Sequence, residues 1–425
     1  MLSKRLDLLF SVMKKAGRVA LLLVLSVVSR ETYAARSPMS VDSVIARRMH
    51  ARSIPVVDSN SVRFFYTGHD KFVDLFDAVR NARSSIHLEY FNFRNDSIAG
   101  LLFQLLAQKA AEGVEVRAMY DDFGNRSNNS PISRAMHDSI CATGVRLVRF
   151  DPIKFPWVNH IIPRDHRKIV VIDGQIAYTG GMNVADYYIK GIPGIGDWHD
   201  MHMRIEGPVV REIQTVFCRM WRKSTGESLL DNDKYFPALK PAGNCRMSFV
   251  DRHSGKTSDV MRDLYVTMID AAHHSIKIIN PYFVPTHRVR KALKRAIDRG
   301  VKVEILVSAR GDIPLTPQTA HYVSNNYMKR GATVYLFEGG FHHTKMMIVD
   351  DICCTVGSVN LDSRSLRCDY EANMLILDKQ ATDELVAHFE EQKKHSFLMY
   401  KGWYREQSFG HRFQGWFGNL LTPFL

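Results

Sequence analysis

The chain contains one short motif twice, and this duplication constrains its architecture more than any other feature. The pattern H-x-K-x4-D occurs as His166, Lys168 and Asp173, and 177 residues later as His343, Lys345 and Asp350. In both copies a strand-like apolar run separates lysine from aspartate, and a loop of small residues with an asparagine follows, at 180–183 and 357–360. Two His–Lys pairs predict one active site assembled from two halves, and such a site suits covalent chemistry on a phosphodiester.

The spacing of histidine and lysine has a physical reason. Alternate side chains of a strand share a face, so His166 and Lys168 point together into a cleft. A lysine ammonium is a fixed cation for phosphate oxygens, and an imidazole can act as nucleophile or general acid near neutral pH. Asp173 and Asp350 lie seven residues after their histidines and would face away from the cleft on a straight strand. We therefore expect these two carboxylates to support the site rather than to react.

A metal site is the main alternative, because histidine and aspartate are both metal ligands. The lysine argues against it, since an ammonium offers no lone pair and repels a cation. A single copy would be weak support, as histidines on strands are usually structural or exposed. Two copies, each followed by an asparagine loop, favour catalysis that uses no metal and no organic cofactor.

The sequence around the motifs resembles the phospholipase D superfamily, and several of its segments are similar to those of the bacterial cardiolipin synthases. The resemblance runs from about Phe64 to the C-terminus. It includes Ile-His-Leu-Glu-Tyr-Phe at 86–91, Trp-His-Asp-Met-His at 198–202, Asn-Pro-Tyr-Phe-Val-Pro at 280–285 and Gly-Ser-Val-Asn-Leu-Asp-Ser-Arg-Ser at 357–365. The doubled motif is highly specific for the superfamily. The segments at 280–285 and 357–365 are fairly specific for the synthase branch.

The resemblance implies a role for each residue of the site. By family analogy His166 is the nucleophile and His343 the general acid, and the near-symmetry of the motifs leaves the reverse open. Family members hold each catalytic imidazole with a carboxylate on a later strand, and the best matches are Asp200 for His166 and Glu371 for His343. The alternative is that both carboxylates are solvent-facing strand residues. Besides the two motif lysines, the residues expected to bind phosphate are Asn183, Ser358 and Asn360.

The N-terminal segment predicts a signal peptide or a membrane anchor. Basic residues precede an uncharged run at 19–29, which is too short to span a bilayer comfortably as a helix. The short apolar core followed by Thr-Tyr-Ala at 32–34 is typical of a secretory signal. An uncleaved anchor is the second interpretation, a buried helix the third, and a mitochondrial presequence is also compatible. We expect a location at the bacterial cell membrane, with the catalytic domains on the outer, periplasmic or extracytoplasmic side.

Strand-like and helical segments alternate in the same order in both halves. The first half has a strand at 85–91, a helix at 98–111 and a strand from 114, and the second repeats them at 275–279, 289–298 and 301–304. This alternation implies an α/β sandwich in each half. The family fold is the same: two tandem phospholipase D-like α/β sandwich domains, related by a pseudo-two-fold, with one shared active site.

The segments between these elements define a domain organisation. We predict a leader at 1–35, a polar linker at 36–60, a first domain at 61–222 with its motif at 160–187, a connector at 223–259, a second domain at 260–400 with its motif at 337–364, and an aromatic and basic tail at 401–425. Aromatic residues among arginines and lysines suit a bilayer interface. A C-terminal helix packed on the protein core is an equal alternative for the tail.

Composition is consistent with this organisation but discriminates poorly. The 425 residues are 45% hydrophobic, enough for two packed domains. The net charge of +13 fits an anionic partner, although most of it is ordinary solvated surface. The six cysteines show no zinc or thioredoxin spacing and leave the redox compartment open.

The resemblance implies a cardiolipin synthase-like phosphatidyltransferase that converts two phosphatidylglycerol molecules to cardiolipin and glycerol through a phosphatidyl-histidine. Its expected partners are anionic phospholipid and a membrane surface, with no nucleic acid, and the oligomeric state is open. The first alternative is a phosphodiesterase of the phospholipase D type, acting on phospholipid or, less in keeping with the leader and tail, on nucleic acid. The second is a non-catalytic lipid-binding protein, against which two complete motifs count.

Overall fold

The computed structural model describes residues 39–154, 162–253 and 259–422. The predicted leader lies outside the described residues. In the described part, no helix combines the length and the apolar character needed to cross a bilayer.

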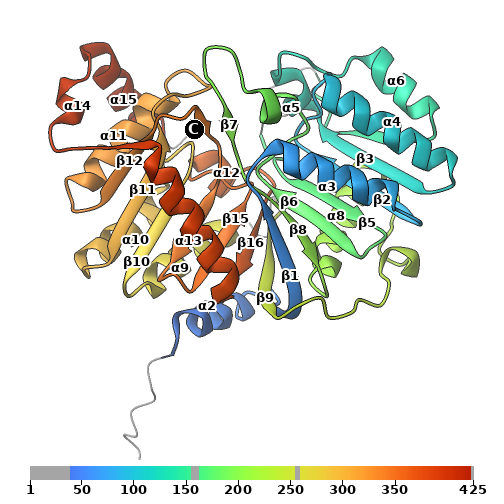
Figure 1. The fold of residues 1–425 in the computed structure, drawn as a ribbon, viewed down its shortest axis with the longest axis horizontal. Helices are drawn as coiled ribbons and strands as arrows, with labels where there is room; N and C mark the ends of the chain where they lie inside the picture. The colour runs from blue at the N-terminus through green and yellow to red at the C-terminus, as the bar shows by residue number, and fades with distance from the viewer. Residues whose placement is uncertain (1–38, 155–161, 254–258, 423–425) are drawn as a thin grey trace, which may run out of the picture.

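One continuous sheet of 15 strands runs through both halves of the molecule (Figure 1). The first half supplies β1 (Val57–Phe65), β2 (Ser85–Tyr90), β3 (Glu115–Asp121), β4 (Arg146–Phe150), β5 (Lys168–Ile172), β6 (Ile176–Gly180) and β8 (His202–Glu206). The second half supplies β9 (Cys245–Arg252), β10 (Ser275–Ile279), β11 (Lys302–Ser308), β12 (Thr333–Phe337), β14 (Met346–Val349), β15 (Cys353–Gly357), β16 (Glu371–Ile376) and β17 (Ser396–Leu398).

The strand order repeats on both sides of the centre, where β1 pairs antiparallel with β9. Reading outward, the first half runs β1-β8-β6-β5-β2-β3-β4 and the second runs β9-β16-β15-β14-β10-β11-β12, with β17 added at the edge. Each of the seven strands of the first half thus has a counterpart in the second. The tandem α/β fold with a pseudo-two-fold relation is confirmed.

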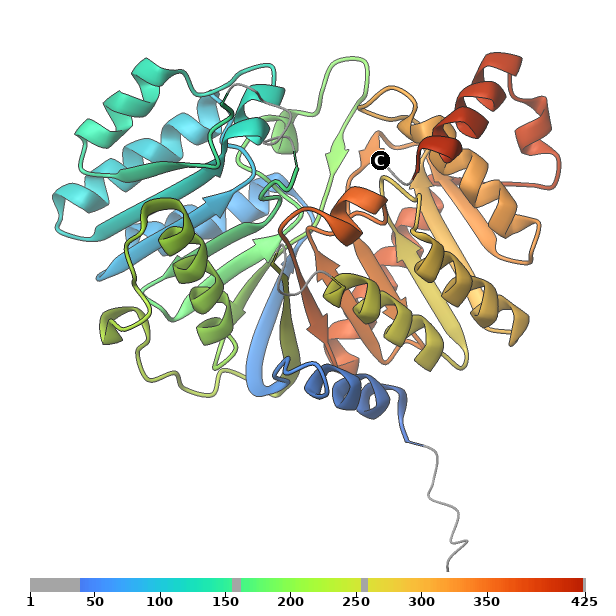
Figure 2. The same ribbon diagram turned by 180° about the vertical axis from the view of Figure 1, so that it is seen from behind.

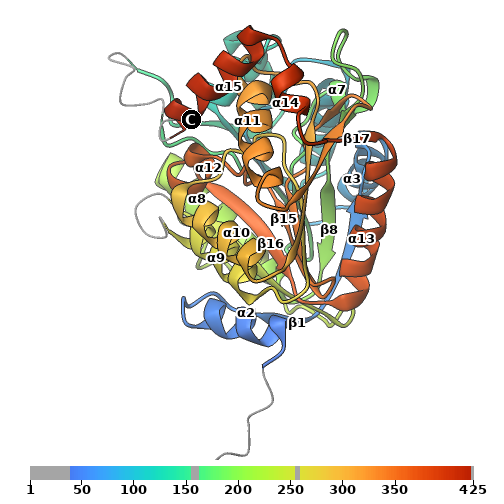
Figure 3. The same ribbon diagram turned by 90° about the vertical axis from the view of Figure 1, so that its left-hand side faces the viewer.

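Helices cover both faces of this sheet (Figures 2 and 3). The first half contains α3 (Gly68–Arg80), α4 (Ser97–Ala111), α5 (Asp122–Ser127), α6 (Arg134–Ala142), α7 (Tyr187–Lys190) and α8 (Val210–Thr225). The second half contains α9 (Val260–Ala271), α10 (His287–Asp298), α11 (Thr316–Met328), α12 (Ser363–Arg367) and α13 (Lys379–Lys394), after a 3-10 turn at Asp233–Tyr235. In Figure 3, α3 and α13 lie on one face while α8, α9 and α10 lie on the other.

The two motif strands are buried on both sides because helices cover both faces. Every residue of β5 and β14 is buried, which explains why each reads as a continuous apolar run rather than an alternating one. The neighbouring parallel strands β2 and β3 are joined by α4, whose first turn is capped by the Asp96 side chain accepting from Ala99 N. The strand expected at 85–91 and the helix expected at 98–111 are observed at these positions.

Two segments differ from the sequence-based expectation. The segment 36–60, predicted as a linker, contains the helix α2 (Val41–His50), and the predicted connector 223–259 supplies the central strand β9. Helix α2 forms because Val41, Ile45 and Met49 recur at helical spacing and bury against α9. Burial of each such side chain is worth about 1.5–3 kcal/mol, so a polar average composition concealed a packed helix.

Candidate active site

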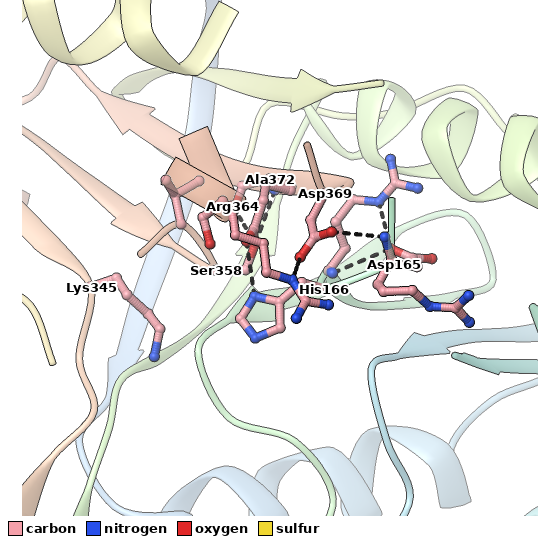
Figure 4. Close-up of polar contacts among 12 residues, drawn as sticks. Asp165, His166, Lys345, Ser358, Arg364, Asp369 and Ala372 are labelled. Carbon is pink, nitrogen blue, oxygen red and sulfur yellow. Dashed lines mark hydrogen bonds and ion pairs between the residues drawn. The ribbon is translucent and has the colours of Figure 1, made fainter. Parts of the chain in front are cut away.

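The two motif histidines lie just before equivalent strands of the two halves. His166 precedes β5, and His343 follows the short strand β13 (Phe341–His342) that leads to β14. The paired lysines are Lys168, the first residue of β5, and Lys345, the residue before β14, and both are buried. Burial, Lys168 and then Lys345 of the second half lower the pKa of His166, and Figure 4 shows the Lys345 side chain on the same side of the site as the His166 ring. The two half-sites therefore form one site.

Each histidine is oriented by a carboxylate from the opposite half. His166 Nδ1 lies 3.0 Å from Glu371 Oε1, and His343 Nδ1 lies 2.7 Å from Asp200 Oδ2. The predicted pairing of Asp200 with His166 and of Glu371 with His343 is therefore wrong, although both carboxylates do contact a motif histidine. Both carboxylates are fully buried, so the alternative of solvent-facing residues is also wrong.

Backbone hydrogen bonds between the halves cause this exchange. His343 N donates to His199 O at 2.6 Å, where β13 pairs in parallel with the short strand β7 (Trp198–His199). In the equivalent place His166 N donates to Tyr370 O at 3.0 Å. His199 and Tyr370 directly precede the two carboxylates in the chain. Each motif histidine is thus linked to the carboxylate of the other half through one peptide group.

The loops after the motifs hold the two carboxylates in different ways. A Cβ atom on Gly181 would overlap Asp200 Oδ1, so the absence of a side chain lets this loop lie against the carboxylate. The equivalent position in the second half is Ser358, whose hydroxyl donates to Glu371 Oε2 and accepts from Ala372 N (Figure 4). Because its single proton is used in this way, Ser358 orients Glu371 and is not a free donor to phosphate. This corrects its predicted phosphate-binding role.

Asn183 and Asn360 occupy equivalent loop positions and are both buried. Within the described residues, the Oδ1 atom of each has no hydrogen-bond partner. A buried amide that is incompletely paired costs free energy unless a ligand pairs with it. Both asparagines are therefore available to a polar ligand in the site.

Burial and mutual repulsion lower the pKa values of the basic groups. Burial lowers the pKa of Lys168 to about 7 and that of Lys345 to about 8, against the opposing attraction of Glu371 and Asp200. The pKa of His343 falls to about 4 through burial and the Lys345 charge. Burial and both motif lysines also hold the pKa of His166 well below its usual value. Each of these cations would be stabilised by an anion, so the site favours a negatively charged ligand.

The two orienting carboxylates differ in ionisation. Burial raises the pKa of Glu371 to about 7, and Lys168 only partly opposes the shift. Burial acts on Asp200 in the same direction, but Lys345 and His343 outweigh it and keep the pKa of Asp200 below its ordinary value. At neutral pH Asp200 is therefore the more strongly ionised of the two carboxylates.

The motif aspartates lie outside the site and brace the turn after each motif strand. Asp173 accepts from the backbone N–H groups of residues 83–85 at 2.7–2.9 Å, and Asp350 accepts from those of residues 273–275 at 2.7–2.8 Å. Both have a φ of 53°. They link each motif strand to β2 or β10, in line with the expected supporting role, and within the described residues neither carboxylate is hydrogen-bonded to His166 or His343.

Sequence reasoning missed an ion-pair chain beside His166. Arg364 Nε donates to Asp369 Oδ2 at 2.6 Å, and Asp369 Oδ1 accepts from Arg164 N at 2.8 Å (Figure 4). Arg164 in turn donates to Asp121, so the chain joins the two halves. Arg364 also lowers the pKa of His166 by its charge. Its place within the distinctive phrase at 357–365 was the signal that could have identified it.

Aromatic rings line both histidines. The ring of Phe91 meets that of His166 edge-on with centroids 5.0 Å apart. Around His343 the rings of Trp198 and Tyr282 lie at 5.4 and 6.1 Å. These rings reduce the access of water to the imidazoles and explain why burial dominates their pKa shifts.

Known proteins are similar to this chain in sequence and in fold. Residues 75–221 and 265–393 match the family described as cardiolipin synthase, phospholipase D-like domain. A probable cardiolipin synthase of Bacillus subtilis is 34% identical over 82% of this chain and 69% of its own length, and a cardiolipin synthase of Oceanobacillus iheyensis is 34% identical over 86% and 76%. The crystal structure of a phosphatidylserine synthase of Haemophilus influenzae has a TM-score of 0.67 at 15% identity, covering 90% of this chain and 100% of that one. At such low identity, this last likeness concerns the fold alone.

Proposed function

The chain belongs to the cardiolipin synthase family of phospholipase D-like proteins, and from this premise we propose that it is a phosphatidyltransferase that converts two phosphatidylglycerol molecules to cardiolipin and glycerol. The observation that carries the proposal is the crossed arrangement of two histidines, each held through Nδ1 by a carboxylate of the other half. This leaves two Nε2 atoms for one phosphodiester, one to attack and one to transfer a proton.

In the first step, His166 Nε2 attacks phosphorus and the bond to the glycerol head group breaks. Protonated His343 gives its Nε2 proton to the departing glycerol oxygen, and the phosphatidyl group remains on His166. Lys168 and Lys345 bind the non-bridging oxygens. Burial and the charge of Lys345 lower the pKa of His343, and the anionic phosphodiester opposes that charge, so substrate binding favours the imidazolium that this step requires.

In the second step, a hydroxyl of another phosphatidylglycerol attacks the same phosphorus. His343 accepts the hydroxyl proton, the new P–O bond forms and the P–N bond to His166 breaks. Asn183 and Asn360 suit a glycerophosphate, because an amide can donate to a phosphate oxygen and accept from a glycerol hydroxyl. The site thereby returns to its initial protonation state.

The assignment of His166 as nucleophile follows the family analogy, and the difference between the two carboxylates is in line with it. An attacking imidazole must be neutral, and Glu371, with a pKa of about 7, adds little negative charge to favour the imidazolium of His166. A proton donor must be cationic, and Asp200 is ionised beside His343. The electrostatics therefore favour the same direction as the family analogy.

The product ratio tests transfer against hydrolysis. Purified enzyme in phosphatidylglycerol membranes should release cardiolipin and glycerol in near-equal amounts, with little phosphatidic acid, as measured by thin-layer chromatography and a glycerol assay. If phosphatidic acid predominates even at high phosphatidylglycerol content, the enzyme is a phospholipase D-type hydrolase. Absence of any turnover, with lipid binding retained, would instead support the non-catalytic alternative.

The proposal includes neither a metal nor an organic cofactor. Lysine follows histidine at i+2 in both motifs, and an ammonium at that position repels a cation. Activity should therefore survive EDTA at a concentration that removes zinc and magnesium. Loss of activity that one divalent ion restores would contradict this mechanism.

The proposed location is the bacterial cell membrane, with the catalytic domains on its outer side. Two features support it: the signal-like sequence of the N-terminal segment and the phospholipid substrates of the family. Protease treatment of intact spheroplasts tests the orientation, because an outward-facing catalytic part should be cleaved while a cytoplasmic marker protein survives.

A further inference from the structure

Helix α15 (Phe409–Leu421) carries its apolar side chains on the side away from the protein. Five large residues with helical spacing are exposed, with exposed fractions of 76% for Phe409, 50% for Phe413, 46% for Trp416, 41% for Phe417 and 53% for Leu420. We call this set the aromatic stripe. A surface helix of a globular protein ordinarily buries its apolar stripe and exposes its polar residues. In α15 this relation is reversed.

The opposite side of α15 is fixed against α11 by glycines. A Cβ atom on Gly418 would overlap Thr319 Oγ1, and one on Gly415 would lie 2.6 Å from Gln318 O. The ring of His411 stacks on His321 with centroids 5.3 Å apart. The two glycines let this face approach α11 closely, and the packing leaves the aromatic stripe on the opposite side. Of the two alternatives for the tail, the packed helix is confirmed for one face only.

The basic residues beside the aromatic stripe favour a lipid surface as its binding partner. Three exposed basic residues, Lys401, Arg405 and Arg412, flank or lie on α15, with Glu406 as the acidic residue among them. Tryptophan and phenylalanine beside arginine and lysine are typical of helices that lie in the head-group region of a bilayer. Thirteen residues are too few to cross a bilayer, so such a helix would lie in its plane.

The position of α15 connects this surface to the catalytic site. His411 lines a cavity of about 400 Å³ together with Arg310 and Asp312. Asp312 accepts a hydrogen bond of 2.7 Å from the hydroxyl of Tyr282, whose ring lies edge-on to His343. Figure 3 shows α15 at the same end of the molecule as α7, opposite α2, and the exposed Ile189 belongs to α7. A surface that meets α15 would thus adjoin this cavity, and Asp312 in its lining contacts the Tyr282 that packs against His343.

We propose that α15 is a membrane-docking helix, which inserts its aromatic stripe among the head groups of an anionic bilayer and thereby holds the catalytic end of the protein against the lipid. The proposal rests on the proposed function only in that the bound lipid is then also the substrate. Docking itself requires no turnover, and it can be measured separately.

The test compares two double variants of the full chain that remove equal numbers of exposed apolar residues. F413S/F417S changes the aromatic stripe, whereas V73S/L101S changes two side chains of α3 and α4 that are 57% and 52% exposed. Both are made in the His166→Ala background, so that binding is read without reaction. Flotation with vesicles containing phosphatidylglycerol should show a vesicle partition about tenfold weaker for F413S/F417S, and unchanged for V73S/L101S.

A second measurement reports α15 directly, whatever the N-terminal segment contributes to binding. Brominated phosphatidylglycerol quenches tryptophan fluorescence on contact. The full chain should lose part of its fluorescence on brominated vesicles, and Trp416→Phe should remove that quenched part. Equal quenching in both proteins would refute docking by α15.

Two further outcomes separate this proposal from its alternatives. If F413S/F417S converts a dimer to a monomer in sedimentation while flotation is unchanged, the aromatic stripe joins two copies of the chain and docking is refuted. If docking is observed but the active enzyme yields phosphatidic acid rather than cardiolipin, the transferase proposal fails and the docking proposal stands. Activity on short-chain monomeric phosphatidylglycerol should be equal in F413S/F417S and the unmodified enzyme.

Discussion

The two histidine–carboxylate pairs occupy equivalent positions of a duplicated fold, yet they differ in charge. In the pair of His343 with Asp200, a short carboxylate lies against a glycine and stays ionised through Lys345 and His343. In the pair of His166 with Glu371, the carboxylate has a pKa raised by burial to about 7. The comparison teaches that duplication supplied two similar imidazoles, while small differences around the carboxylates favour separate roles as acid and nucleophile.

The largest expected effect concerns the histidines themselves. His166→Ala and His343→Ala should each lower the transfer rate at least about 10³-fold without unfolding the protein. An aryl phosphodiester, whose leaving group needs no proton, should separate them. Its first step should persist in His343→Ala and be absent from His166→Ala, as measured by a burst of released phenolate with mass detection of the covalent enzyme. A burst in His166→Ala alone would reverse the two roles.

The second prediction concerns the carboxylates. Asp200→Asn replaces an ionised partner and should lower kcat about 10²- to 10³-fold at pH 6. Glu371→Gln replaces a carboxyl group that is protonated below pH 7, so the loss at pH 6 should be less than about tenfold. Steady-state kinetics with circular dichroism as a folding control decide this. Equal losses in the two variants would remove the proposed difference between the pairs.

The pH dependence of the free energy of unfolding tests the pKa of Glu371 independently of catalysis. The pKa of Glu371 is higher in the folded chain, about 7, than its ordinary value of 4.5. The folded state therefore binds more protons between these values, and its free energy of unfolding falls as pH rises from 4.5 to 7. Glu371→Gln should lose this part of the pH dependence in urea titrations, and should gain stability relative to the unmodified protein at pH 8.

The third prediction concerns the lysines, which carry the depressed pKa values of about 7 for Lys168 and about 8 for Lys345. Each loses its positive charge as pH rises through its pKa, so kcat/KM should fall by about tenfold per pH unit between about 7 and 8, and by about a hundredfold per unit above 8. Arginine stays charged in this range. Lys168→Arg, normalised to its own maximum, should therefore decline at a higher pH. An unchanged alkaline limb would assign the titration to another group.

The smallest effect on catalysis is expected at the motif aspartates, where the two halves are alike. Asp173→Ala and Asp350→Ala each remove an acceptor of three backbone hydrogen bonds. Each should lower the free energy of unfolding by about 1–3 kcal/mol and change kcat less than about threefold. Chemical denaturation and steady-state assays of the same preparations provide the test. A large fall in kcat of a variant that is still folded would indicate a catalytic role.

The sequence by itself determined the duplicated site and most of the regular structure. The recurrence of the motif, together with the matching strand and helix patterns, was sufficient to predict two α/β halves and the histidines and lysines that meet between them. These features depend on local periodicity and on the chemistry of single residues, and both can be read along the chain. The apolar stripe of α2 was the exception, because a polar average concealed its three buried residues.

Only the tertiary structure decided which groups pair across the halves. Asp200 and His343 are 143 residues apart, and Glu371 and His166 are 205 apart, so no local pattern connects them. Their pairing follows from the pseudo-two-fold, which brings the peptide before each carboxylate to the histidine of the other half. The outward direction of the aromatic stripe on α15 has the same kind of cause. Periodicity in the sequence defines the apolar face of α15. The glycine face of the same helix packs against α11, and this packing leaves the apolar face exposed to solvent.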